Sequence, residues 1–147
     1  MEETPIKRAL SIAGSDSGGG AGIQADLRAF ARCGVHGMTA ITALTAQNTV
    51  AVDAVEMVSP VMIEAQVRAV LTDIGVDAVK VGMLGDRATI EAVARAIDTL
   101  PAGTPVVVDP VIVAESGARL LASEAETGLR ELILPRAAVV TPNLPEA

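Results

Sequence analysis

The residues with the clearest chemical potential lie in one glycine-rich stretch near the N-terminus, Gly14 to Gly22, which reads GSDSGGGAG. An apolar run precedes this stretch and a helical pattern follows it, so a strand enters the turn and a helix leaves it. Glycines let the backbone take positive φ values and let a ligand approach the main chain closely. The start of the helix offers unpaired N–H groups and a partial positive charge. The stretch therefore predicts a ligand site, with a flexible turn as the alternative.

Neither of the two familiar nucleotide-binding loops fits this stretch. A Walker-type phosphate loop requires Lys and then Ser or Thr after its last glycine, whereas Ile23 follows Gly22 here. A dinucleotide-binding loop requires a G-x-G-x-x-G spacing and an acidic residue near the end of the second strand. The second predicted strand runs into Ala46-Gln47-Asn48, which contains no acid. Other residues must therefore indicate the ligand.

Polar or sulfur-containing side chains follow several predicted strands where each strand ends. Gln47 follows an apolar strand, Met83 lies between two glycines after another, and Asp109 follows Val106-Val107-Val108. In open α/β sheets, ligands bind at the edge where the parallel strands end. We expect Gln47 and the glycine loop to share this edge. For Met83, simple packing is the alternative to a place in the site.

Asp26 lies in the early turns of the helix that follows the glycine loop. A carboxylate near a helix N-terminus is favoured by the helix dipole, so a purely local role is one interpretation. A role in ligand binding is the other, and the residue pattern leaves both open. The single cysteine, Cys33, and the single histidine, His36, form no nucleophile–base arrangement or metal cluster, and we assign them incidental roles.

Composition excludes several classes of protein. With 147 residues, half of them apolar, the chain can bury the core of one domain. A net charge of −7 repels nucleic-acid phosphates, and a single Phe without Trp or Tyr leaves no stacking platform, so nucleic-acid binding is disfavoured. The N-terminal residues 1–8 lack an apolar signal core, and no apolar run reaches membrane-spanning length. We therefore expect a soluble cytoplasmic protein without membrane contact.

The elements that must position these residues follow from hydrophobic periodicity. Apolar strands without alternation, separated by amphipathic helices, predict an α/β fold whose mainly parallel sheet is covered on both faces. The strands are predicted over residues 9–13, 38–44, 77–81, 106–108 and 137–140, with a short strand or flap within 50–57. Helices are predicted to begin just after the glycine loop, at Ser59-Pro60, at Asp86, and at a Ser123-x-x-Glu126 capping box. The first helix should bury Ile23, Leu27 and Phe30 and turn Gln24, Arg28 and Arg32 outward.

Four segments occur in an order that resembles one enzyme family: Gly14 to Asp26, Ala46-Gln47-Asn48-Thr49, Val81-Gly82-Met83-Leu84, and Thr141 to Ala147. From Arg8 onward the chain resembles the hydroxymethylpyrimidine/phosphomethylpyrimidine kinases, the thiamine-pathway members of the ribokinase-like family. The resemblance implies a three-layer αβα ribokinase-like fold. It also implies ATP-dependent phosphorylation of 4-amino-5-hydroxymethyl-2-methylpyrimidine, and then of its monophosphate, for thiamine diphosphate biosynthesis.

The resemblance carries site roles to particular positions of this sequence. It implies that five residues contact the aminopyrimidine substrate: Gly14, Asp26, Gln47, Met83 and Val111. It implies that three others lie near Mg²⁺ and the phosphates, without a direct metal ligand among them: Asp109, Asn143 and Glu146. An aminopyrimidine suits such a set, because a carboxylate and an amide can meet its polar edge while Met and Val enclose its faces.

The resemblance also implies a longer chain that continues to a Gly-Thr-Gly-Cys type loop, which supplies the anion hole and the residue that activates the substrate hydroxyl. No such loop occurs in this sequence. We therefore interpret residues 1–147 as the N-terminal portion of a single kinase domain, with catalytic residues expected beyond Ala147 and a homodimer allowed for the full-length protein. The alternatives are a pyridoxal-type vitamin kinase of the same fold and a non-catalytic pyrimidine-binding module.

Overall fold

The computed structural model describes residues 5–144 and 146–147. Within these residues six strands form one sheet in the order β3-β2-β1-β4-β5-β6. All neighbouring strands run parallel except β3, which is antiparallel to β2, so the predicted mainly parallel sheet is confirmed. The strands are β1 (Arg8–Asp16), β2 (His36–Gln47), β3 (Val52–Met57), β4 (Ala78–Val81), β5 (Val106–Val108) and β6 (Val139–Val140).

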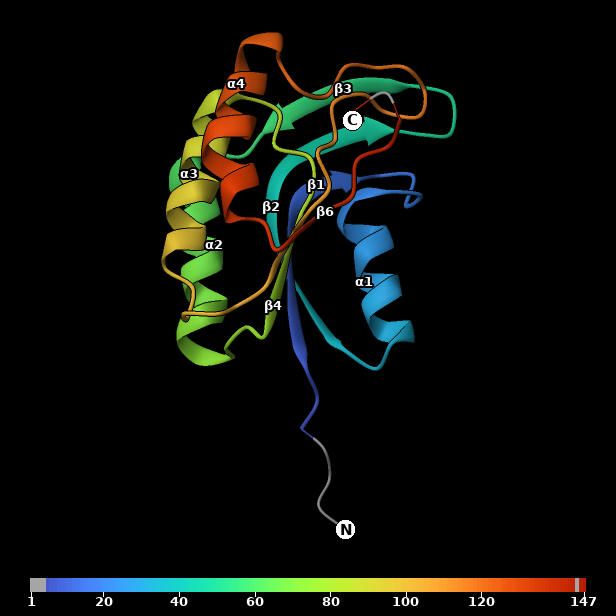
Figure 1. Ribbon diagram of the computed structural model, residues 1–147. Coiled ribbons are helices and arrows are strands. Elements are labelled where there is room, and N and C mark those ends of the chain that lie inside the picture. The colour runs from blue at the N-terminus through green and yellow to red at the C-terminus, as the bar shows by residue number, and fades with distance from the viewer. Residues whose placement is uncertain (1–4, 145) are drawn as a thin grey trace.

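Helices cover the two faces of the sheet unequally. Figure 1 shows α1 (Gly22–Arg32) alone on one side, with α2 (Pro60–Asp73), α3 (Arg87–Asp98) and α4 (Glu126–Gly128) together on the other. This arrangement is the predicted three-layer αβα order. No helix in the described part of the chain combines the length and apolarity that crossing a membrane requires.

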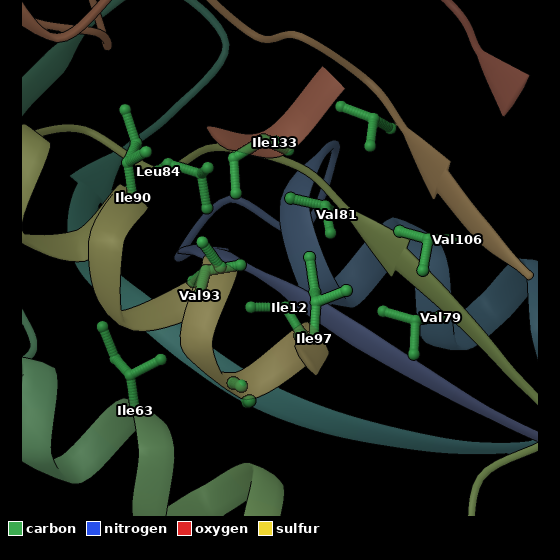
Figure 2. Packing of buried hydrophobic residues seen from close by; sticks show 14 of the residues in the cluster. Ile12, Ile63, Val79, Val81, Leu84, Ile90, Val93, Ile97, Val106 and Ile133 are labelled. Atoms are coloured by element: carbon green, nitrogen blue, oxygen red, sulfur yellow. The ribbon is translucent and has the colours of Figure 1, made fainter. Parts of the chain in front are cut away.

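The main core lies between the sheet and the layer formed by α2 and α3. Alternate residues of the central strand, Leu10 and Ile12, are fully buried on this side. They belong to one apolar cluster with Val79 and Val81 of β4 and with Ile90 of α3, part of which Figure 2 shows. Strands buried in this way show the near-continuous apolar runs that the sequence displays.

Helix α1 buries less of its apolar stripe than the sequence pattern predicts. Ile23 is buried, but Leu27 and Phe30 are only partly buried, so the predicted fully buried stripe is wrong at two positions. Both side chains lie against Gly37 of β2, where an added Cβ would meet them at 2.8 and 3.0 Å. In the described residues α1 is the sole helix on this face, and its neighbours are β1 and β2. Without a flanking helix, its outer apolar side chains keep some solvent contact.

Local signals locate two of the later helix starts correctly. The Ser59 hydroxyl accepts a hydrogen bond from the Met62 N–H, and Pro60 is the first helical residue. The Asp86 carboxylate accepts from the Thr89 N–H at 2.8 Å. These two contacts satisfy N–H groups that would otherwise lack a partner at the helix start.

The predicted capping box at Ser123 is wrong. The helical stretch 123–136 begins at Ser123 itself, and no side chain caps its start. Its hydrogen-bond pattern changes from 3₁₀ to α to π and back to 3₁₀. Glu126 pairs with Arg119 instead of reaching back to the helix start, because the preceding loop brings that guanidinium close.

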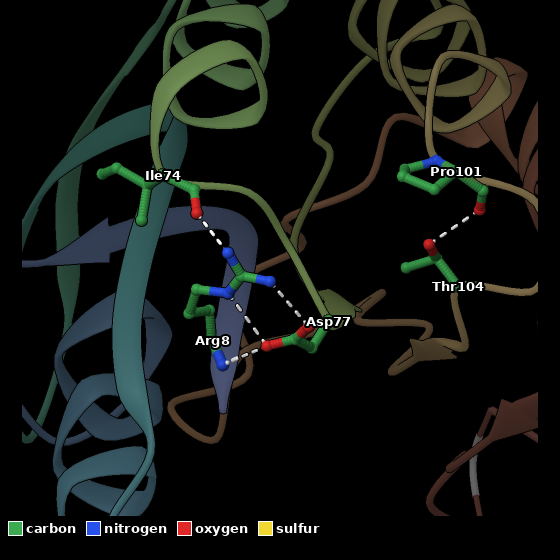
Figure 3. Close-up of polar contacts among 5 residues, drawn as sticks. All are labelled: Arg8, Ile74, Asp77, Pro101 and Thr104. Carbon is green, nitrogen blue, oxygen red and sulfur yellow. Dashed lines mark hydrogen bonds and ion pairs between the residues drawn. The ribbon is translucent and has the colours of Figure 1, made fainter. Parts of the chain in front are cut away.

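An ion pair ties the sheet together at the end where β1 and β4 begin, as Figure 3 shows. The Asp77 carboxylate accepts from the Arg8 backbone N–H at 2.8 Å and from the Arg8 guanidinium Nε and Nη2 at 3.0 and 2.9 Å. The same guanidinium donates to the Ile74 carbonyl at the end of α2. The Arg8 guanidinium and backbone N–H hold the pKa of the Asp77 carboxyl well below its usual range.

Candidate functional site

A cavity of about 600 Å³ opens where β1, β2, β4 and β5 end. The connections from β1 and β4 leave toward opposite faces of the sheet, because α1 covers one face and α3 the other. This is the switch point at which open α/β sheets bind ligands. Six of the eight residues predicted for the site line the cavity, namely Gly14, Asp26, Gln47, Met83, Asp109 and Val111.

The glycine loop is organised around a carboxylate of its own, Asp16. Its side-chain oxygens accept from the N–H groups of Gly18, Gly20 and Ala21 at 2.8, 2.9 and 2.8 Å. The loop N–H groups that the sequence offered to a ligand are therefore partly satisfied within the protein. Loop shape rather than open N–H groups is what this stretch contributes to the cavity.

Gly22 joins the loop to α1 in a conformation that requires glycine. Its φ is +56°, and an added Cβ would lie 2.4 Å from the carbonyl oxygen of Gly14. Gln24, predicted to point outward, instead turns to the loop. Its Oε1 accepts from the Asp16 N–H at 2.9 Å and its Nε2 donates to the Ser15 hydroxyl at 2.8 Å. The prediction failed because β1 extends to Asp16, beside the first turn of α1.

Asp26 binds side chains from two strands rather than the start of its helix. Its Oδ2 accepts from the Ser11 hydroxyl at 2.6 Å and from the Lys80 ammonium at 3.0 Å. The start of α1, at Ala21, has no side-chain cap, so the purely local interpretation of Asp26 does not describe its contacts. Among residues 5–144 and 146–147 no donor meets Oδ1. Because Asp26 lines the cavity, Oδ1 is available to a ligand.

Lys80 was missed by sequence reasoning although it lines the cavity. The available signal was a lone charged residue in the otherwise apolar strand Ala78-Val79-Lys80-Val81. Its side chain passes over Gly82, where an added Cβ would lie 2.8 Å from the ammonium nitrogen. Lys80 is partly buried, with 22% of its side chain exposed.

Apolar side chains form the walls beside this polar cluster. Met83 is buried and lies over Gly14, where an added Cβ would be 3.2 Å from its sulfur. The buried Thr42 hydroxyl donates to the Met83 carbonyl at 2.7 Å and holds that segment in place. Val111, after β5, also lines the cavity.

Gln47 ends β2 at the rim of the cavity. Its backbone N–H donates to the Ser17 hydroxyl at 2.8 Å, and that hydroxyl donates to the Gln47 carbonyl at 2.6 Å, which ties the strand end to the glycine loop. The Thr45 hydroxyl donates to the Ser15 carbonyl at 2.8 Å and lies 3.2 Å from the Gln47 side-chain Oε1. In the described part of the chain no acceptor meets the Gln47 Nε2.

Asp109 lies half-buried on the cavity wall, whereas the two other predicted residues, Asn143 and Glu146, are not among the lining residues. Burial raises the pKa of the Asp109 carboxyl; the Lys80 charge opposes this rise, while Glu146 and Asp26 add to it. Glu146 and Asn143 each accept from the other's backbone N–H at 3.1 Å. Glu146 also accepts from the Ile112 N–H at 3.3 Å.

The remaining candidates do not enlarge the site. The described residues contain no group of three or more His, Cys, Asp or Glu side chains placed to hold a metal ion. Cys33 is exposed at the end of α1, and neither it nor His36 lines the cavity. The site is thus a polar cluster of Asp26, Lys80 and Asp109 with apolar walls.

Comparisons with known proteins agree on one family. The family model for phosphomethylpyrimidine kinase matches residues 16–147. The chain is 57% identical over 139 residues to the hydroxymethylpyrimidine/phosphomethylpyrimidine kinase of Rhizobium meliloti, covering 95% of this chain and 52% of that protein. The chain spans about half the length of the curated relatives it matches.

Two solved structures are similar in fold and in sequence. The crystal structure of phosphomethylpyrimidine kinase from Clostridium difficile has a TM-score of 0.88 at 45% identity, with 95% of this chain and 60% of that one covered. The pyridoxal kinase of Staphylococcus aureus in complex with AMP-PCP and pyridoxal has a TM-score of 0.81 at 37% identity, with 97% and 50% covered. The chain is thus similar both to a phosphomethylpyrimidine kinase structure and to a pyridoxal kinase structure.

Proposed function

The chain belongs to the phosphomethylpyrimidine kinase family, and from that premise we propose that it forms the alcohol-binding part of a kinase for 4-amino-5-hydroxymethyl-2-methylpyrimidine and its monophosphate. The observation that carries the proposal is the position of Asp26 in the cavity, with Oδ2 held by two donors and Oδ1 left for a ligand. Thiamine diphosphate biosynthesis is the pathway that this substrate serves.

The cavity suits a flat aminopyrimidine. The exocyclic amino group is a donor for the Asp26 Oδ1, and a ring nitrogen is an acceptor for the Gln47 amide. Met83 and Val111 supply apolar contact for the faces of the ring, and Gly14 leaves room for Met83 to lie close. A few convergent polar groups within apolar walls are what small-molecule sites commonly show.

We propose ATP as the phosphoryl donor and Mg²⁺ as the metal ion that accompanies it. Asp109 and Glu146 support this proposal, because Glu146 accepts from the N–H of Ile112, which brings its carboxylate to the segment that follows Asp109. Mg²⁺ in proteins usually keeps several waters and binds substrate phosphates, so carboxylates near the phosphates fit without a preformed metal cluster. Bound ATP·Mg²⁺ supplies the phosphoryl group and offsets its developing charge. The protein's own task here is to hold the alcohol in position.

The direct test of binding is calorimetric titration of the 147-residue chain with the pyrimidine alcohol, beside an Asp26→Asn variant. Removing a charged hydrogen-bond partner costs about 1.5–3 kcal/mol, so the variant should bind roughly ten- to a hundredfold more weakly. A denaturant melt of each protein separates this effect from lost stability. Equal affinity in the two proteins would contradict the role of Asp26, and no binding by either would overturn the proposed function.

Phosphoryl transfer by the chain itself is tested with ATP, Mg²⁺ and the same alcohol. The family resemblance assigns hydroxyl activation to a Gly-Thr-Gly-Cys type loop, which this sequence does not contain. We therefore propose that residues 1–147 are part of a single kinase domain and expect no turnover on the scale of ordinary enzymes, about 1–10³ per second. Turnover in that range would show that these residues suffice for catalysis.

A pyridoxal-type kinase is the second candidate, favoured by the likeness to the Staphylococcus aureus enzyme. Pyridoxal carries no exocyclic amino donor for the Asp26 carboxylate, so the cavity favours the aminopyrimidine. Titration with pyridoxal under matched conditions decides between them. Tighter binding of pyridoxal than of the pyrimidine alcohol would favour this second candidate, and binding of the alcohol by a full-length protein without turnover would favour a non-catalytic binder.

A further inference from the structure

Two donors from neighbouring strands meet on one oxygen of Asp26. Ser11 of β1 and Lys80 of β4 are register partners in the parallel pair, so their side chains leave the same face of the sheet. The Ser11 hydroxyl lies 2.6 Å and the Lys80 ammonium 3.0 Å from the same Asp26 Oδ2. A carboxylate fixed through one oxygen by two strand residues presents its other oxygen in a set direction.

The terminal torsion of an aspartate is broad when nothing holds it, so the direction of Oδ1 depends on these contacts. Ser11 is fully buried, and Lys80 and Asp26 have 22% and 17% of their side chains exposed. Gly82 provides the space through which the Lys80 ammonium reaches the carboxylate. Side chains from two strands therefore fix the orientation of the Asp26 carboxylate, which lies on α1.

Lys80 also carries the one positive charge among the described residues that line the cavity. The other charged groups there are carboxylates, those of Asp16, Asp26, Asp109 and Glu115. Without Lys80, Asp26 would face Asp109 with only a hydroxyl as partner, and like charges would drive the two carboxylates apart. Both effects would turn Oδ1 away from a fixed ligand position.

We infer that Lys80 is a positioning residue, which aims the Asp26 Oδ1 into the cavity and thereby sets the preference of the site for ligands that carry an exocyclic amino donor. The inference rests on the proposed function, because the amino group is that of the proposed substrate. Lys80 does not touch the ligand in this role and acts through Asp26.

The experiment compares two ligands by calorimetry on the 147-residue chain: the pyrimidine alcohol and 5-hydroxymethyl-2-methylpyrimidine, which lacks the amino group. Their ratio of dissociation constants measures the amino preference. Lys80→Met should lower this ratio roughly tenfold, the scale of one charged hydrogen bond. Lys80→Arg, which keeps the charge and the donors, should restore most of it. Lys7→Met is the matched control, because Lys7 is the other lysine of the chain and is exposed. This variant should leave the ratio unchanged.

A merely structural role for Lys80 predicts a different result. Lost packing would weaken the binding of both ligands alike and leave the ratio of their dissociation constants unchanged. That outcome would overturn the inference while the proposed function stands. In an Asp26→Asn background, Lys80→Met should no longer change the ratio, and an undiminished effect there would also overturn it. Should Lys80→Met fail to fold by circular dichroism, Lys80→Gln tests the same loss of charge. A wild-type chain that binds neither ligand would instead refute the proposed function.

Discussion

Three aspartates of this protein differ in the partners that their carboxylates bind. Asp16 accepts hydrogen bonds from three loop N–H groups, Asp26 binds Ser11 and Lys80, and Asp77 forms an ion pair with Arg8. The first carboxylate shapes the loop, the second faces the cavity and the third joins two strands far from it. Substitution of each therefore has its own signature.

Asp16→Asn should destabilise the protein through the glycine loop. An amide presents one acceptor oxygen where the carboxylate presents two, so at least one of the three loop N–H groups loses its partner. Leaving a partly buried donor unsatisfied costs about 1–3 kcal/mol, measured as the change in free energy of unfolding in urea. Asp53→Asn, at an exposed position of β3, is the control and should change little. Equal losses in the two variants would refute the loop role of Asp16.

Asp77 should make stability depend on pH in acid. Its pKa is far lower in the folded protein than the unfolded value of about 3.9, so its contribution is fully present above about pH 4. That contribution is lost as pH falls through the folded value. Unfolding midpoints measured between about pH 2 and 6 should fall more steeply for wild type than for Asp77→Asn. Parallel curves would contradict the ion pair with Arg8.

The residue pattern alone predicted that the glycine loop and Gln47 share the edge at which the cavity lies, and it left the roles of Asp26 and Met83 open. The family resemblance assigned both of these residues to the site, and both line the cavity, but neither source predicted its charge balance. Lys80 escaped because its importance depends on the register between β1 and β4, which places it opposite Ser11. Sequence periodicity contains no information on that pairing. The partners of Asp16 were missed for a different reason, because the glycine pattern predicted that the loop N–H groups face a ligand rather than a carboxylate of the loop itself.

At the scale of elements, the turn from β1 into α1 depends on Gly22 more than on the other loop glycines. Gly22→Ala forces an L-residue into positive φ, which costs about 1–2 kcal/mol, and also drives its Cβ against the Gly14 carbonyl. Gly34→Ala is a matched control, because Gly34 has φ +69° and open space around its Cβ position. Urea melts should show a larger loss for Gly22→Ala. Equal losses would mean that the loop relaxes to accept the methyl group.

Local signals predicted elements well where they act on short stretches. The helix starts at Ser59-Pro60 and Asp86 needed only neighbouring residues, and both appear as expected. The stretch 123–136 also begins at Ser123 as expected, but its capping box is absent because Glu126 pairs with Arg119, a contact that residue spacing does not reveal. β1 and β2 ran past their predicted ends because polar residues near the cavity still pair in the sheet.

At the scale of the whole molecule, the sheet has a poorly covered corner. Val107 and its register partner Val139 face away from the main core, and among the described residues no helix other than α1 lies on that face. Val139 and Val140 of the edge strand are 51% and 39% exposed. Exposed apolar edge strands pair readily with other chains.

We expect the 147-residue chain to self-associate through this corner. Sedimentation across a concentration series should show association in wild type and less of it in Val139→Lys, because an edge lysine opposes strand pairing. Val61→Lys, at a position of α2 that is 80% exposed, is the control and should associate like wild type. A monomer at every concentration would show that this edge of the sheet does not pair with a second chain.

The central position of β1 has a consequence for how the molecule is made. β1 is completed first during synthesis, yet it pairs on one side with β2 and on the other with β4, whose residues are translated much later. At about 5–20 residues per second, the ribosome needs on the order of seconds to supply β4 after β2. Throughout that interval one side of β1 has no strand beside it and Asp26 lacks its lysine. Until Lys80 emerges, the open side of β1 can pair with another chain, and the cavity cannot take shape before Asp109 and Val111 have followed.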